Sequence, residues 1–195
     1  MEIENLTTGP SVEPLSIAVA KGHLNATHSS DDTYISTLIT TARQQFEAET
    51  NRALYAQTWT RYLDYWPACI RPVRVPMLDV TSIKYLDTAS PRVQQTWAAA
   101  NYRVDIFNNR INREVGVVWP NQAYTSNAVE VAYRAGYVDT STSPYTGTVP
   151  ADIIHCLKMM IGTYWRFRES VIDLRVEILP MAAQSIIERY RLYEI

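Results

Sequence analysis

Two cysteines and three histidines are the side chains of this sequence that could support nucleophilic or metal-dependent chemistry. His155 and Cys156 are neighbours and would suggest a thiolate–imidazole pair, but adjacent residues of a helix point in different directions. His23 and His28 add no metal-ligand spacing. The GxSxG, GxGxxG, Walker A and HExxH motifs do not occur. We therefore expect no catalytic residue, no cofactor and no metal ion, and we interpret Cys156 as a small core residue.

Paired carboxylates could in principle perform acid–base catalysis. Asp31 and Asp32 are adjacent, and Glu47 and Glu49 lie close together in one helical segment. Nothing in the sequence sets such groups in contrasting environments, as a general acid and a general base require. We therefore interpret these four residues, and Asp105, as solvated charges.

Basic residues are interleaved with aromatic residues at two places, which suggests binding surfaces. The segments are YWRFR, residues 164–168, and RYRLY, residues 189–193. Such clusters can stack on nucleic-acid bases, but Trp, Tyr and Arg also dominate the energetics of protein interfaces. The first segment belongs to a helix that we expect in the core, so we predict packing there with an interface at its edge. For the second segment we favour docking onto a partner, with packing inside the subunit and nucleic-acid binding as alternatives.

The aromatic composition also points towards interfaces. The chain has 13 Tyr and 5 Trp but only 3 Phe, and residues with an apolar body and a polar tip are enriched where proteins meet. Packing in strands is the alternative explanation, because Tyr and Trp favour strands too. The docking candidates are Arg189, Tyr190, Arg191 and Tyr193, and the candidates for other interfaces are Trp165, Arg166, Arg168 and Trp119.

Composition and charge limit the possible function classes. The chain has 195 residues, of which 47% are hydrophobic and 19% are charged, and this fits one globular domain. The net charge is −2, whereas dedicated nucleic-acid-binding domains are usually strongly basic. The two cysteines form no CxxC pair, so we expect a reduced cytoplasmic compartment rather than a disulfide framework. We also expect no signal peptide and no membrane partner, because no apolar run approaches the roughly 20 residues that span a bilayer.

Four helices are predicted from hydrophobic periodicity and capping residues. They cover residues 17–24, 32–52, 149–169 and 181–193, with Ser16 as N-cap of the first and Ser30 or Asp31 as N-cap of the second. The third helix has a long apolar stripe, so we expect the other helices to pack against it. The polar face predicted for the second helix carries Arg43, Gln44, Glu47 and Thr50.

Between the second and third helices the pattern becomes that of strands, which we predict at residues 58–65, 80–87, 102–106, 110–118 and 128–134. Residues 140–148 are interpreted as a loop. The order predicts an α+β fold, a small bundle of about four helices with an antiparallel β section inserted between the second and third. The predicted organisation is a flexible arm over residues 1–14 and a single domain over 15–195, which comprises helices in 15–54, the β section in 55–137 and the C-terminal helices in 149–195.

Several short segments in a fixed order carry a family resemblance. They are ARQQFEAETNRAL (42–54), QTWTRYLD (57–64), VTSIKYLD (80–87), YRVD (102–105), WP (119–120), VAYRAGY (131–137), VPADI (149–153) and RYR (189–191). In this order and spacing the chain, from about residue 15 onward, resembles the head–tail connector proteins of tailed bacteriophages and prophages, which are also called adaptor or head-completion proteins.

The resemblance implies a non-enzymatic, structural virion protein. Such proteins form a homo-oligomeric ring, typically dodecameric, beneath the portal protein in the neck of the virion, and they are assembled in the cytoplasm of the bacterial host. The ring would extend the channel through which genomic DNA passes without sequence-specific binding, and it would provide the docking surface for a stopper or tail-completion protein. The C-terminal cluster would then dock on the portal. The alternative interpretation is a DNA-binding module of the packaging machinery.

Overall fold

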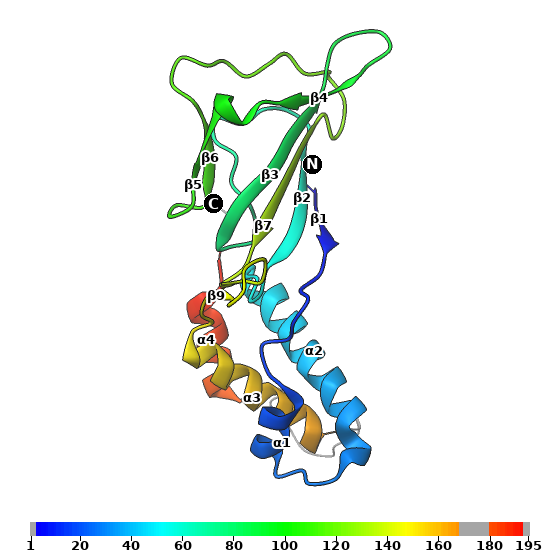
Figure 1. Cartoon of the computed structure of the whole chain (residues 1–195), viewed down its shortest axis with the longest axis vertical. Helices are drawn as coiled ribbons and strands as arrows, with labels where there is room; N and C mark the ends of the chain where they lie inside the picture. The colour runs from blue at the N-terminus through cyan, green and yellow to red at the C-terminus, as the bar shows by residue number, and fades with distance from the viewer. Residues whose placement is uncertain (1–2, 168–179, 193–195) are drawn as a thin grey trace.

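The computed structural model describes residues 3–167 and 180–192 of the chain. The molecule is elongated, with a helical bundle at one end of its long axis and an antiparallel sheet with a hairpin at the other (Figure 1). The strands other than the first lie between the second and third α-helices, so the predicted α+β architecture is confirmed.

The four predicted helices are present as α1 (Ile17–Leu24), α2 (Asp32–Thr50), α3 (Ala151–Arg166) and α4 (Met181–Tyr190). Ser16 caps α1 as expected, because its hydroxyl accepts a hydrogen bond from the Val19 amide at 3.3 Å. Asp31 precedes α2 without a capping hydrogen bond from its side chain. Lys21 of α1 forms a 2.6 Å ion pair with Asp32 and so fixes α1 against the start of α2. Within the described residues no helix is long and apolar enough to cross a membrane.

The helices enclose the first of two hydrophobic cores. Helices α2, α3 and α4 each contribute one apolar stripe, as the 3.6-residue period requires, whereas α1 contributes Ala20 and the connecting segments contribute Leu15, Leu54, Val138 and Val149. The core residues of α2 are Ile35, Leu38, Ile39, Ala42 and Phe46, those of α3 are Ile153, Cys156, Leu157, Met160 and Ile161, and those of α4 are Ala183 and Ile187. The apolar stripe of α3 is therefore central to the bundle, as predicted.

Five strands form the sheet, in the order β1-β2-β7-β3-β4 with antiparallel pairing throughout. They are β1 (Ile3–Thr8), β2 (Gln57–Leu63), β7 (Val129–Ala135), β3 (Met77–Leu86) and β4 (Gln94–Trp97). The central strand β7 alternates strictly between buried and half-buried residues, which is the pattern of a strand with one face on a core. Its buried residues are Val129, Val131, Tyr133 and Ala135.

Two short hairpins complete the β section. Strands β5 (Tyr102–Asp105) and β6 (Arg110–Arg113) form one, and it contributes Ile111 to the second hydrophobic core, which lies against the sheet. The buried residues of this second core are Ala53, Leu63, Ile70, Met77, Ile83, Trp97, Ile111, Val129, Val131, Tyr133 and Ala135. Strands β8 (Val138–Asp139) and β9 (Thr146–Gly147) form the other, and β9 lies inside the predicted loop of residues 140–148 while β8 directly precedes it. The predicted strands are thus present, and β1, β4, β8 and β9 are additional.

Strand β1 corrects the expectation for residues 1–14, which the sequence presents as a flexible arm. Residues 3–8 pair with β2 along the edge of the sheet, with a bulge between Leu6 and Thr8. Most side chains of β1 are exposed, so no hydrophobic alternation marks it in the sequence. Its order comes from backbone pairing with a strand more than 50 residues away, which a local pattern does not contain.

Candidate interaction surfaces

Cys156 is part of the hydrophobic core of the helices, as predicted. Cys156 is fully buried, and its Sγ lies 3.6 Å from the Ala183 carbonyl oxygen, towards which it donates. Burial raises the pKa of Cys156 to about 11, so the nucleophilic thiolate is scarce at neutral pH. In residues 3–167 and 180–192, no group of three or more His, Cys, Asp or Glu side chains is arranged to hold a metal ion.

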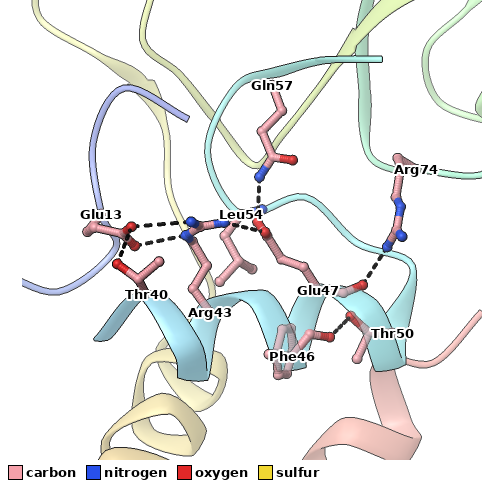
Figure 2. A network of polar contacts seen from close by, with 9 residues as sticks. All are labelled: Glu13, Thr40, Arg43, Phe46, Glu47, Thr50, Leu54, Gln57 and Arg74. Carbon is pink, nitrogen blue, oxygen red and sulfur yellow. Dashed lines mark hydrogen bonds and ion pairs between the residues drawn. The ribbon is translucent and has the colours of Figure 1, made fainter. Parts of the chain in front are cut away.

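A buried polar network joins the bundle to the sheet (Figure 2). The Glu47 carboxylate on α2 accepts hydrogen bonds from the Leu54 amide at 2.9 Å and from the Gln57 side chain at 2.7 Å. Its other oxygen accepts from Arg43 at 2.7 Å. Desolvation raises the pKa of Glu47 in spite of these partners. Arg43, Glu47 and Thr50 of the predicted polar face are therefore buried, whereas Gln44 is exposed as expected. The interpretation of Glu47 as a solvated charge is wrong, because the start of β2 and the chain before α1 cover it.

The remaining groups of Arg43 and Glu47 extend the network to two further segments. Arg43 donates to both oxygens of Glu13, at 2.8 and 3.2 Å, and Thr40 donates to the same carboxylate at 3.0 Å. Arg74, from the loop before β3, donates to the Glu47 carbonyl oxygen at 2.6 Å. One turn of α2 thus fixes the segment after β1, the start of β2 and the loop before β3 (Figure 2).

Strand β1 is attached to the sheet by a second buried carboxylate. Glu4 accepts from the Tyr133 hydroxyl and, at 3.3 Å, from the Val73 amide. The Tyr133 hydroxyl in turn accepts from the Arg74 amide at 3.1 Å, and the Arg74 guanidinium lies 4.8 Å from the centre of the Trp59 ring. Burial raises the pKa of Glu4, although the neighbouring donors oppose this shift.

The raised pKa of Glu4 gives a pH-dependent contribution to stability. The folded protein binds this proton more tightly than the unfolded chain does, so the contribution of Glu4 to folding becomes less favourable as pH rises above the ordinary value of 4.5. We expect Glu4→Gln, which retains an acceptor for Tyr133, to gain stability relative to the wild type between pH 4.5 and pH 7. Urea unfolding at both pH values measures the difference. A difference that is constant or that falls with pH would contradict this assignment.

The C-terminal cluster packs mainly against its own subunit. The Tyr190 hydroxyl lies 3.0 Å from both carboxylate oxygens of Asp152, to which it donates, and its ring lies 5.4 Å from the Arg52 guanidinium. Arg191 donates to the Glu49 carbonyl oxygen at 3.1 Å and pairs with the Glu49 carboxylate at 3.3 Å. Tyr190 and Arg191 thus both have partners inside the subunit, whereas the Arg189 side chain is 65% exposed. Tyr193 lies outside the described residues.

The other predicted interface residues divide between core and surface. Trp119 stacks on Trp66 at 4.5 Å and contacts Trp97 at 4.6 Å, so it belongs largely to the second core. Trp165 is half-buried on the helical core, 5.9 Å from the Tyr34 ring. The other two candidates in this segment are Arg166, which is exposed at the end of α3, and Arg168, which lies outside the described residues.

The β5–β6 turn carries an exposed apolar pair that the sequence interpretation did not select. Phe107 is 99% exposed and Ile106 is 50% exposed. The turn itself is firmly held. The Asp105 carboxylate accepts from the amide and side chain of Asn108, at 3.2 and 2.8 Å, and from Arg110 at 3.0 Å. A fully exposed phenyl ring on a constrained turn is a candidate anchor for a partner.

A cavity of about 350 Å³ lies between β1, β2 and α2. Its apolar lining includes Leu6, Pro10, Ala48 and Trp59, with Arg74 beside them. Among the described residues, the indole nitrogen of Trp59 and the Nε of Arg74 have no hydrogen-bond partner. Both nitrogen atoms are buried, so the cavity itself presents an aromatic wall beside the positively charged Arg74 side chain.

Comparison with known proteins identifies the fold. No protein-family model matches the sequence, and a search of curated proteins gives no significant match. Three solved structures are similar over 99% of this chain and 97% of theirs. They are the neck of an empty gene transfer agent (GTA) particle computed with C6 symmetry (20% identity, TM-score 0.76), the virion of a native GTA particle (22%, 0.75) and the neck of a native GTA particle computed with C12 symmetry (20%, 0.71). At these identities the likeness establishes a shared fold.

Proposed function

We propose that the chain is a structural protein of the virion neck, a head–tail connector that forms a ring beneath the portal of a tailed-phage-like particle. The observation that carries the proposal is the similarity of the whole chain to chains in two GTA neck structures, with TM-scores of 0.76 and 0.71. Those necks were computed with C6 and C12 symmetry, and a ring of twelve copies is compatible with both. The ring would extend the DNA channel and provide the docking surface for a stopper or tail-completion protein.

The charge of the chain supports a channel through which DNA slides. A net charge of −2 gives no strong, general attraction for phosphates, whereas a DNA-binding module of the packaging machinery would need a basic surface. The decisive experiment is mass by light scattering, on the chain alone and with the portal ring of the same particle. We expect a ring of stoichiometric composition with the portal. No association, together with tight DNA binding at moderate salt, would favour the packaging alternative.

Portal docking through the C-terminal cluster is best tested at Arg189. Truncation after Pro180 would remove Ala183 and Ile187 from the core and so confuse folding with docking. Arg189 forms only an exposed 3.4 Å pair with Asp152, so Arg189→Glu should cost less than about 1 kcal/mol of stability. We expect it to weaken portal binding at least about tenfold, the lower range for a contacting interface charge. Arg92→Glu, at another exposed arginine, is the matched control. Equal portal affinity of both variants would contradict docking through Arg189.

A further inference from the structure

We propose that neighbouring copies in the ring contact through a knob and a socket that lie on opposite flanks of each subunit. The knob is the β5–β6 turn with Ile106 and Phe107, and the socket is the cavity lined by Leu6, Ala48 and Trp59. This inference rests on the proposed function, because it takes the second copy from a ring of identical chains.

The knob is suited to binding because its conformation is already fixed. Asp105 holds the turn through Asn108 and Arg110, and the side-chain oxygen of Asn109 accepts from the Met77 amide at 2.7 Å, which anchors the turn to β3. A constrained turn loses little conformational entropy when it binds. Burial of a phenyl ring removes on the order of 150 Å² or more from water, which suits a central interface anchor.

The socket matches the knob in size and chemistry. A cavity of about 150 Å³ is enough for a benzene ring, so the 350 Å³ cavity has room for the Phe107 ring and part of Ile106. The Trp59 ring and the Arg74 guanidinium above it offer aromatic and cation–π surfaces.

The positions of knob and socket fit a closed ring. Figure 1 shows the β5–β6 turn on one flank and β1 with the upper end of α2 on the other, both near the middle of the long axis. A head-to-tail contact between different surfaces closes into a ring when the operation is a rotation without translation along the axis. Pairing between the two edge strands would not satisfy this condition. Strand β4 lies near the top of the molecule and β1 near its middle. In a ring whose axis runs along the long axis of the subunit, copies joined by these edges would be displaced along that axis.

Two variants, each of which disables one of the two contact surfaces and leaves the other intact, test the contact. Phe107→Lys removes the knob, and Ala48→Arg fills the socket from an exposed position of α2; both sites are exposed, so folding should be retained. Under the conditions in which the wild-type chain forms a ring, alone or on the portal, we expect each variant alone to assemble at least tenfold more weakly. An equimolar mixture should give heterodimers that grow no further, because only one of the two possible contacts is intact. Tyr124→Lys, at a residue that is 94% exposed, is the control and should assemble normally.

The outcomes separate this contact from the proposed function. Rings of Phe107→Lys and Ala48→Arg as stable as those of the wild type would overturn the knob and socket and leave the neck assignment intact. A wild-type chain that forms no ring, alone or with the portal, would overturn the neck assignment and this contact with it. A second readout uses Ile106→Cys with Ala48→Cys in a Cys69→Ser background, which keeps the Phe107 ring, and oxidation of the assembled ring should link adjacent copies. A ring without cross-links would also contradict the proposed contact.

Discussion

Replacement of Arg43 with methionine is expected to lower the free energy of unfolding by about 3–5 kcal/mol, the range for a buried ion pair that loses one partner. Arg43 and Glu47 have side chains that are 8% and 10% exposed. Methionine would fill much of the volume of arginine but would leave Glu47 charged and only partly compensated in the interior, and it would also release Glu13. Urea denaturation followed by far-UV circular dichroism at pH 7 measures the loss.

Two controls make the Arg43 result specific. Lys84→Met breaks a surface pair with Glu130, whose closest atoms are 3.8 Å apart, and should cost less than about 1 kcal/mol. The double variant Arg43→Met with Glu47→Gln removes the buried, unpaired charge of Glu47 but keeps a side-chain acceptor for the Leu54 amide. It should therefore recover much of the stability that Arg43→Met loses. If the double variant is no more stable than Arg43→Met alone, the cost does not come from an unpaired Glu47.

The pH dependence of Arg43→Met provides an independent check. Without Arg43, the pKa of Glu47 should rise further above its ordinary value, because burial already raises it and Arg43 opposes that shift. The folded variant would then bind a proton more tightly than its unfolded chain, so its stability should increase as pH falls through that range. The deficit relative to the wild type should therefore be smaller at pH 5 than at pH 7.

The elements that are best predicted from the sequence are those marked by a local pattern, either hydrophobic periodicity or a capping residue. Helices α2, α3 and α4 carry apolar stripes, and α1, which buries only Ala20, is marked by its N-cap Ser16. Strand β7 is equally easy to predict, because its apolar and polar residues alternate and only one of its faces is buried. Strand β1 has no such signal, since its order depends on backbone pairing with β2.

The polar face of α2 shows why burial is harder to predict than helicity. Arg43, Glu47 and Thr50 alternate with the apolar stripe, and such residues on a helix usually face water. Here the sheet and the chain before α1 cover them, and their partners Glu13, Leu54 and Gln57 come from other segments. A sequence pattern locates the face but not the element that lies on it.

The candidate interaction residues illustrate the same limit. The cluster of Arg189 to Tyr193 suggests an exposed surface, but Tyr190 donates to Asp152, 38 residues earlier, and this pairing is visible only in the fold. By contrast, Ile106 and Phe107 directly precede the turn pair Asn108 and Asn109. Apolar side chains at a turn, where polar ones are usual, were a usable signal for an exposed anchor.

Replacement of Trp97 with alanine is expected to cost about 3–5 kcal/mol, the usual range for loss of a large buried aromatic side chain. Trp97 is the one buried residue of β4 and lies 5.6 Å from Trp66, 4.6 Å from Trp119 and 5.6 Å from Tyr102, measured between ring centres. Its removal would leave a cavity and would free the edge strand that it anchors. Urea unfolding followed by circular dichroism is the suitable measurement, because tryptophan fluorescence would change with the substitution itself.

Trp119→Ala, compared with Trp97→Ala, separates a packing role from an interface role for Trp119. Stacking of Trp119 on Trp66 at 4.5 Å predicts a clear loss of stability in the isolated chain, smaller than that of Trp97→Ala because Trp119 is only half-buried. Tyr124→Ala, at an exposed aromatic residue, should change stability by no more than about 0.5 kcal/mol. If Trp119→Ala behaves like Tyr124→Ala in the isolated chain but impairs ring assembly, Trp119 acts at an interface. If Trp119→Ala destabilises the isolated chain in proportion to the buried area of Trp119, packing in the second core explains why its loss of stability is larger than that of Tyr124→Ala.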